Sequence, residues 1–328
     1  MALLEAGPAD GPLMVFVHGW PERGLVWRAQ VAHFAAAGWH CVAPDLRGYG
    51  DAPKPAAPEA YAIEHVVSDL LARHDSLGGQ PAVWVGHDWG SPVVWALAGH
   101  HRERCRGVAS LCVPYLPGGF GLANLLPLVD RDLYPVEEFP YGQWDYYQLY
   151  AERFDQVTAD FEADVAATVS LLLRRGRPGS VGKPARSAGV RANGGWFGAA
   201  HRAPQLPRDE TMLSPEDFGE VVAGLSASGF RGPNSWYLND AANLAYAASV
   251  PRGGRLDLPV LFVHAAWDGI CETVRSSLAD PMRAACPDLT EETVDAGHEL
   301  ILESPLEVNA ALESWLDARG LRPSPGGG

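Results

Sequence analysis

Residues 82–91 constrain the fold of this chain more than any other segment. An apolar run predicts a short buried strand, and the residues that follow predict a helix opened by Ser91. Gly86 and Gly90 lack a Cβ, so strand and helix can approach closely where they meet. This spacing is typical of a sharp elbow whose apex side chain, here Asp88, projects beside the N–H groups of the helix start.

An aspartate at this apex indicates a particular chemistry. A carboxyl group with a pKa of about 3.9 is an anion at neutral pH without help from a base. Asp88 could therefore attack an electrophilic carbon directly and form an alkyl ester, which a serine could not do before losing its proton. The alternative is an ordinary aspartate that caps a helix N-terminus.

Composition narrows the class of protein. The chain has 328 residues, of which 47% are hydrophobic, and a formal net charge of −15. This balance argues against nucleic acid or an anionic membrane as a partner. The five cysteines show no metal-ligand spacing, so we expect free thiols in a reducing compartment. Without a secretion signal or an apolar stretch of membrane-spanning length, the sequence predicts a soluble, cytoplasmic protein.

Short apolar runs alternate with helical patterns at both ends of the chain. This alternation predicts an α/β fold, a mostly parallel sheet with helices on both faces. The expected strands are 13–18, 41–44, 82–85, 107–112, 258–264 and 292–294, and the expected helices are 27–37, 61–76, 91–100, 273–286 and 305–318.

The alternation stops in the middle of the chain, which predicts an insertion. We expect residues 1–114 and 257–320 to form the core and residues 115–256 a mainly helical cap over the carboxyl ends of the strands. The stretch 174–208 is rich in Gly, Pro and basic residues, which is typical of a mobile or extended loop. The Pro- and Gly-rich tail 321–328 is predicted to be disordered.

Two further polar residues follow predicted strands, and their order along the chain indicates a particular fold. Asp268 comes just after the strand that resumes the alternation, and His298 comes after the last strand, preceded by a glycine. Nucleophile, acid and histidine in that order are expected of the α/β-hydrolase fold. Among eleven histidines these features single out His298, whereas His264 and His87 are interpreted as structural.

The expected roles follow from the chemistry. His298, held by Asp268, would take a proton from the water that hydrolyses the Asp88 ester. The oxyanion that forms needs fixed donors, and the backbone N–H groups of Trp20 and Trp89 are the candidates. Alternatively, the residues around Trp20 form only a tight turn, with a cis peptide bond before Pro21.

These residues together resemble a known family, the soluble and microbial epoxide hydrolases of the α/β-hydrolase fold. Haloalkane dehalogenases share much of the pattern, including the tryptophan after the aspartate. The motifs that carry the resemblance are His18-Gly19-Trp20-Pro21, Gly86-His87-Asp88-Trp89-Gly90, Asp268 and His298.

Two segments of the predicted cap favour the epoxide hydrolases. Tyr147-Gln148-Leu149-Tyr150 and 229–237 are similar to the two lid-tyrosine segments of that family. The resemblance implies that Tyr147 and Tyr237 bind the substrate and donate O–H groups to the epoxide oxygen. A phenol keeps its proton at neutral pH and can give one to the leaving oxygen. The pair Tyr146-Tyr147 leaves an ambiguity of one residue, and the motif favours Tyr147.

The resemblance implies an ether-bond hydrolase that converts an apolar epoxide to a vicinal diol without a metal or an organic cofactor. The alternatives are a haloalkane dehalogenase with Trp89 and Trp20 binding the halide, and a binding protein without turnover. The family usually has a strand and hairpin before residues 4–7, so we expect either that the sheet lacks its edge strand or that the start of the chain is incomplete. The residues leave the substrate's identity and the presence of a homodimer open.

Overall fold

The computed structural model describes residues 3–323 and confirms the α/β architecture. Seven strands form one sheet in the order β1-β3-β2-β4-β5-β6-β7. All neighbours are parallel except β1, which pairs antiparallel with β3 at the edge. The strands are β1 (Leu3–Ala6), β2 (Leu13–Val17), β3 (His40–Pro44), β4 (Ala82–His87), β5 (Cys105–Leu111), β6 (Val260–Ala265) and β7 (Leu289–Val294).

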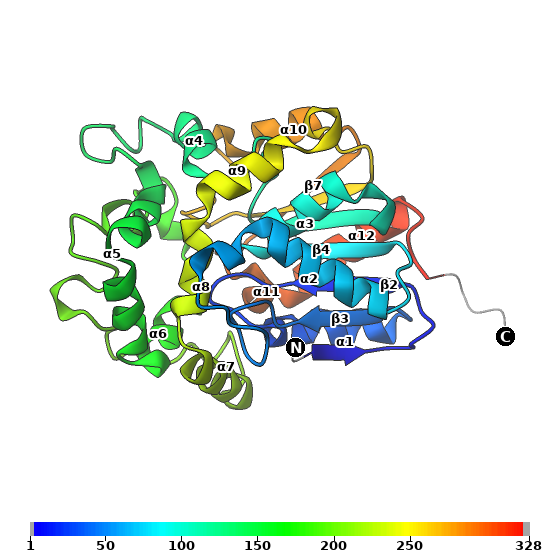
Figure 1. Cartoon of the computed structure of the whole chain (residues 1–328), viewed down its shortest axis with the longest axis horizontal. Helices are drawn as coiled ribbons and strands as arrows, with labels where there is room; N and C mark the ends of the chain where they lie inside the picture. Colours follow the sequence, from blue (N-terminus) through cyan, green and yellow to red (C-terminus); the bar gives the residue numbers. More distant parts are fainter. Residues whose placement is uncertain (1–2, 324–328) are drawn as a thin grey trace.

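Helices cover both faces of this sheet, as the alternating pattern predicted (Figure 1). Because the crossover after β2 runs in the opposite direction from those after β3 and β4, α1 lies on one face and α2 and α3 on the other. The C-terminal helix α12 packs against α1. These helices are α1 (Arg28–Ala36), α2 (Ile63–Ser76), α3 (Gly90–His100), α10 (Asp280–Ala285), α11 (Leu300–Glu303) and α12 (Pro305–Ala318).

The central strands are buried along their whole length. Every residue of β2, β3, β4 and β6 is buried, which explains why these strands appear in the sequence as apolar runs rather than as alternating patterns. Large aromatic side chains such as Trp27, Trp84 and Trp315 fill the space between sheet and helices. The rigid sheet therefore holds the carboxyl ends of its strands at defined positions.

Six helices lie between β5 and β6, where the alternation stops. Figure 1 shows α5, α6 and α7 gathered at one end of the molecule, beyond the sheet. The predicted loop 174–208 lies among them and contains only short 3-10 turns. The helices are α4 (Leu122–Leu125), α5 (Asp145–Glu162), α6 (Val165–Leu172), α7 (Pro215–Ser228), α8 (Arg231–Ser235) and α9 (Asp240–Ala248).

The structure corrects two of the predicted elements. The helix expected over 273–286 is confined to α10, after a 3-10 turn at Ser277–Ala279, because Pro281 sits in the first turn and cannot lie in the interior of a longer helix. Leu321, expected in a disordered tail, is buried, and its carbonyl accepts a hydrogen bond from Arg106 (2.8 Å). The rest of that prediction, 324–328, lies outside the described residues.

At the other end of the sheet β1 forms the edge, and no strand lies beyond it within residues 3–323. All five cysteines are buried and unpaired, as expected. None of the helices in the described part of the chain is both long and apolar enough to cross a bilayer.

Candidate active site

The candidate site residues gather at the carboxyl edge of the sheet. Asp88 directly follows β4, and Asp268 and His298 follow β6 and β7. The loop with Trp20 follows β2, which lies next to β4. Because parallel strands end at the same edge, side chains far apart in the sequence meet there.

The turn at Asp88 is strained in the way an elbow requires. Asp88 has a φ of +46°, a left-handed conformation that non-glycine residues rarely adopt. A Cβ on Gly90 would overlap with the carbonyl oxygen of Val17, and one on Gly86 would crowd Gly90. The close approach predicted for these two glycines is therefore confirmed. Ser91 does not cap the helix, because it is buried inside the first turn and its hydroxyl donates to Leu111 (3.2 Å).

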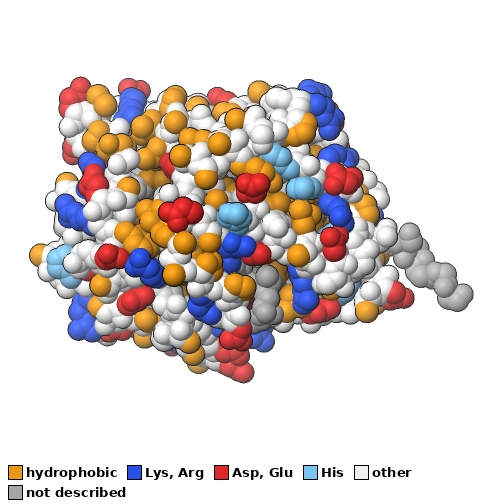
Figure 2. All heavy atoms as spheres, viewed as in Figure 1, with side chains coloured by type: hydrophobic (Ala, Val, Ile, Leu, Met, Phe, Trp, Pro, Cys, Tyr) orange, Lys and Arg blue, Asp and Glu red, His pale blue; other side chains and the backbone are white. Residues whose placement is uncertain are grey.

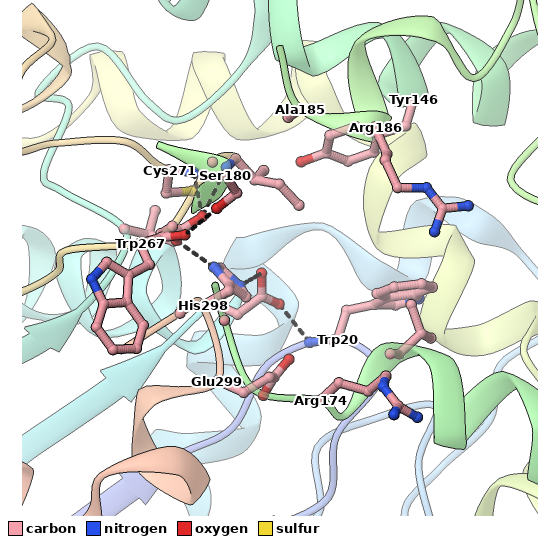
Figure 3. A pocket seen from close by; sticks show the side chains of 18 of the residues that line it. Trp20, Tyr146, Arg174, Ser180, Ala185, Arg186, Trp267, Cys271, His298 and Glu299 are labelled. Atoms are coloured by element: carbon pink, nitrogen blue, oxygen red, sulfur yellow. Dashed lines mark hydrogen bonds and ion pairs between the residues drawn. The ribbon is translucent and has the colours of Figure 1, made fainter. Parts of the chain in front are cut away.

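Asp88, His298 and Asp268 form a continuous chain of contacts. Asp88 Oδ2 lies 3.3 Å from His298 Nε2, and His298 Nδ1 lies 2.6 Å from Asp268 Oδ2. The other oxygen of Asp268 accepts hydrogen bonds from the N–H groups of Ile270 (2.8 Å) and Cys271 (3.0 Å). Asp268 is thus fixed at both oxygens and orients the imidazole ring toward Asp88 (Figure 3).

Electrostatics make this chain an ion-paired unit. Burial by itself would lower the pKa of His298, but the charge of Asp268 and the hydrogen bonds to Asp268 and Asp88 raise it well above its usual value. Burial would raise the pKa of Asp268, but the charge of His298 and its hydrogen bonds lower it. Asp268 and Asp88 therefore favour the protonated, cationic form of His298.

The loop after β2 holds the remaining oxygen of Asp88. The Trp20 N–H donates to Asp88 Oδ1 at 2.5 Å, and the Trp20–Pro21 bond is cis. A Cβ on Gly19 would overlap with the Asp88 side chain, so a glycine is needed there. Within residues 3–323 the hydrogen bonds include none from the Trp89 N–H to Asp88. The Trp20 indole donates to Asn234 (3.0 Å), a buried residue of α8.

A buried charged cluster behind the site was not foreseen from the sequence. Glu22 accepts a hydrogen bond from Gly19 N–H (2.9 Å) and lies 3.1 Å from His87 Nδ1. His87 Nε2 lies 2.7 Å from the carbonyl oxygen of His298, so it must carry a proton. His87 thereby ties the loop after β2 to the loop after β7. The sequence contains only two weak indications of this charged cluster. They are a glutamate just after the His-Gly-Trp-Pro motif and Glu299 just after His298.

The protonation of this cluster follows from its burial. The pKa of Glu299 is raised well above its usual value by burial and by the charge of Glu22, so Glu299 is neutral. The pKa of His87 is raised despite burial, because Glu22 stabilises the imidazolium. Glu22, His87 and Glu299 lie close enough to surround a metal ion. An imidazolium, however, offers no lone pair to a metal, so the arrangement suits proton sharing better.

Aromatic side chains from the helices between β5 and β6 lie opposite Asp88. The rings of Tyr147 in α5 and Tyr237 in the 3-10 turn Trp236–Leu238 are 5.4 Å apart and perpendicular. The Tyr237 ring lies 5.2 Å from Trp89, the neighbour of Asp88. Burial raises the pKa of both phenols well above the usual value, which keeps them protonated. Tyr146 lines the same cavity.

These residues line a cavity of about 510 Å³. Figure 3 shows His298 and Trp20 at its floor and Tyr146 projecting toward them from the opposite wall. Asp88 contacts both His298 and Trp20 and therefore lies at the floor as well. The wall also includes apolar side chains such as Phe120 and Val113. The cavity therefore combines aromatic and apolar walls with charged side chains, among them the Asp88 carboxylate, and it is large enough for a small organic molecule.

Fold and site together define an α/β hydrolase. A sequence profile described as the α/β hydrolase fold matches residues 12–305. The chain is 32% identical over 326 residues to "Epoxide hydrolase A" of Mycobacterium tuberculosis, covering 98% of this chain and 95% of that protein. It is 30% identical to "Bifunctional epoxide hydrolase 2" of Sus scrofa and spans 53% of that longer protein.

Solved structures agree with this comparison. The crystal structure of Epoxide Hydrolase A from Mycobacterium thermoresistibile superposes with a TM-score of 0.77 at 30% identity, over 96% of this chain and 94% of that one. An epoxide hydrolase from an endophytic Streptomyces superposes with a TM-score of 0.75 at 29% identity, over 96% and 91%. The chain belongs to the α/β-hydrolase-fold epoxide hydrolases.

Proposed function

We propose that this protein adds water to an epoxide to give a vicinal diol, through an ester of Asp88. The observation that carries the proposal is the position of the Asp88 carboxylate. It lies between the Trp20 N–H and His298, on the floor of a cavity whose wall includes Tyr147 and Tyr237. The names of the related proteins support an epoxide rather than a haloalkane as substrate.

In the first step Asp88 Oδ2 attacks a ring carbon and the C–O bond of the epoxide breaks. The ring oxygen stays attached to the substrate and becomes a strong base, so it needs O–H donors. Tyr147 and Tyr237 suit this role, because both line the cavity and both remain protonated. Proton donation of this kind typically contributes about 10²–10⁴-fold to rate.

Alkylation then changes the state of His298. The ester has no charge, so His298 loses one of the two anions that held its pKa high. The proton that His298 gives up passes through solvent to the tyrosinate, and so replaces the proton that the tyrosine gave to the alkoxide. The neutral imidazole, with Nδ1 still donating to Asp268 at 2.6 Å, can now accept a proton from water at Nε2.

In the second step this water attacks the ester carbonyl of Asp88. The oxyanion forms on Oδ1, which already accepts from Trp20 N–H. A fixed donor at that point is worth roughly 10²–10³-fold in other enzymes. Collapse of the tetrahedral intermediate releases the diol and regenerates the carboxylate. The steps use water and the chain's own side chains, and we propose that residues 115–256 act as the cap that closes the chamber.

A single turnover in H₂¹⁸O tests the covalent step. With enzyme in excess over epoxide, the label should enter the Asp88 carboxylate while the first diol carries none. Mass spectrometry of the peptide with Asp88 and of the diol measures both. A first diol that carries the solvent label would show direct attack of water and end the covalent proposal.

A further inference from the structure

The segment 174–208 stands out electrostatically. The chain as a whole has 40 acidic and 25 basic residues, yet this segment contains no Asp or Glu. On the face shown in Figure 2, by contrast, acidic and basic side chains are interspersed. The cations of the segment are Arg174, Arg175, Arg177, Lys183, Arg186, Arg191, Arg202 and Arg208.

Ion pairing divides these eight cations into two groups. Arg191, Arg202 and Arg208 each have a carboxylate partner, at 2.9 Å, 3.1 Å and 3.4 Å respectively. The other five have no carboxylate within 4.0 Å in the described part of the chain. Those five, and none of the paired three, line the cavity above Asp88.

The acidic side chains that line the described cavity offset only a small part of this charge. The acids that line it in the described structure are Asp88, Asp268 and Glu299. Both aspartates face His298, and Glu299 is neutral for the reasons given above. The part of the cavity beside residues 174–186 is therefore positively charged, although the protein is strongly anionic.

Among the five cations without a carboxylate partner, Arg186 has the position that most strongly indicates a role in ligand binding. It is exposed, and no hydrogen bond within residues 3–323 involves its guanidinium. Figure 3 shows it extending from the cap segment beside Tyr146 into the open space on the Trp20 side. It also lines a second, adjoining cavity of about 820 Å³, which shares Leu171, Leu172, Arg186 and Trp196 with the first.

We propose that the epoxide carries a carboxylate and that Arg186 binds this group at the mouth of the cavity. The inference rests on the proposed epoxide hydrolysis. A guanidinium can donate two parallel N–H bonds to a carboxylate, and this one has no partner that would compete. Lys183 and Arg177 add to the positive potential along the same wall. Hydrolysis leaves the carboxylate unchanged, so the group serves only in recognition.

A matched pair of substrates tests this assignment. 4-(Oxiran-2-yl)benzoate carries a carboxylate on the far side of its ring from the epoxide, and its primary amide has nearly the same shape without the charge. We expect the wild-type protein to have a higher kcat/KM for the acid than for the amide. The ratio of the two values should fall about fivefold in Arg186→Gln, as for one partly exposed charge pair. Arg186→Lys should keep most of the ratio, because the charge remains.

Arg255→Gln is the control, since it removes the same charge from a residue that lines neither cavity. It should leave the ratio unchanged, and high salt should lower the wild-type ratio by screening. A ratio near one in the wild type, or one that Arg186→Gln leaves unaltered, would refute the assignment while turnover of the amide upheld epoxide hydrolysis. Failure to hydrolyse the acid, the amide and styrene oxide alike would instead refute the proposed function itself.

Discussion

Replacement of Asp268 by asparagine tests the proposed mechanism most directly. In the native protein Asp268 Oδ1 accepts the N–H groups of Ile270 and Cys271, and Oδ2 lies 2.6 Å from His298 Nδ1. In the Asp268→Asn variant the amide oxygen must stay on the two N–H donors, because the amide nitrogen cannot accept them. The NH₂ group of the new side chain then faces His298 Nδ1.

This reversal forces a change of tautomer. Nδ1 must become an acceptor, so the proton of the neutral imidazole moves to Nε2, the atom that lies 3.3 Å from Asp88. A protonated Nε2 cannot take a proton from water. The equivalent change in a serine-protease triad lowers kcat about 10⁴-fold, and we expect hydrolysis of the Asp88 ester to slow by about 10³–10⁴-fold.

Ring opening does not use His298 as a base, so it should slow much less. The ester should therefore accumulate in Asp268→Asn. Intact-protein mass spectrometry after quenching with acid should show close to one equivalent of added epoxide. The measured burst should be followed by very slow release of diol.

Asp257→Asn provides the matched control. Asp257 forms ion pairs with Arg252 and Arg255 at the surface, away from the cavity. The Asp257→Asn variant should neither accumulate the ester nor lose turnover. If Asp268→Asn lost turnover without any covalent adduct, the covalent route would be wrong. Turnover within tenfold of the wild type would instead refute the assigned role of Asp268.

Three further outcomes follow from the same geometry. Tyr147→Phe and Tyr237→Phe should each slow single-turnover ring opening by about 10²-fold, because each removes one donor to the developing alkoxide; an unchanged burst rate in both would exclude them as donors. Because the pKa of His298 in the folded protein lies well above 6.5, its stabilisation is complete below about pH 6.5 and is lost as pH rises through the folded value. Urea unfolding at several pH values should show this loss in the wild type but not in His298→Gln. Gly19→Ala should lower turnover by about 10²-fold because its Cβ would displace the nucleophile, whereas Gly179→Ala, with open space around it, should have no effect on the same assay.

Much of the fold and of the candidate site could be predicted because both follow from local patterns. Buried parallel strands are apolar along their length, so they are visible as runs in the sequence. The topology then brings the residues after β4, β6 and β7 to one edge, which is why Asp88, Asp268 and His298 could be expected to meet. One of the predictions that failed, the helix over 273–286, contained a proline whose effect the apolar pattern hid.

Other parts of the site depend on contacts that no spacing reveals. Glu22 and His87 are 65 residues apart, and their partnership exists only because β2 and β4 are neighbours in the sheet. Tyr146 and Tyr147 are neighbours in the sequence, and only the folded chain shows that both line the cavity.

The sequence by itself determined the strand–turn–helix elbow, the order of the three polar residues and the glycines that let the backbone close around them. These features are local requirements of backbone geometry. Each one depends on the residue type at a given position, so it can be recognised in the sequence. Only the tertiary structure decided which cations of segment 174–208 face the cavity and which pair with carboxylates elsewhere. An irregular segment has no periodicity that orients its side chains, so their direction is set by the surfaces against which the segment packs.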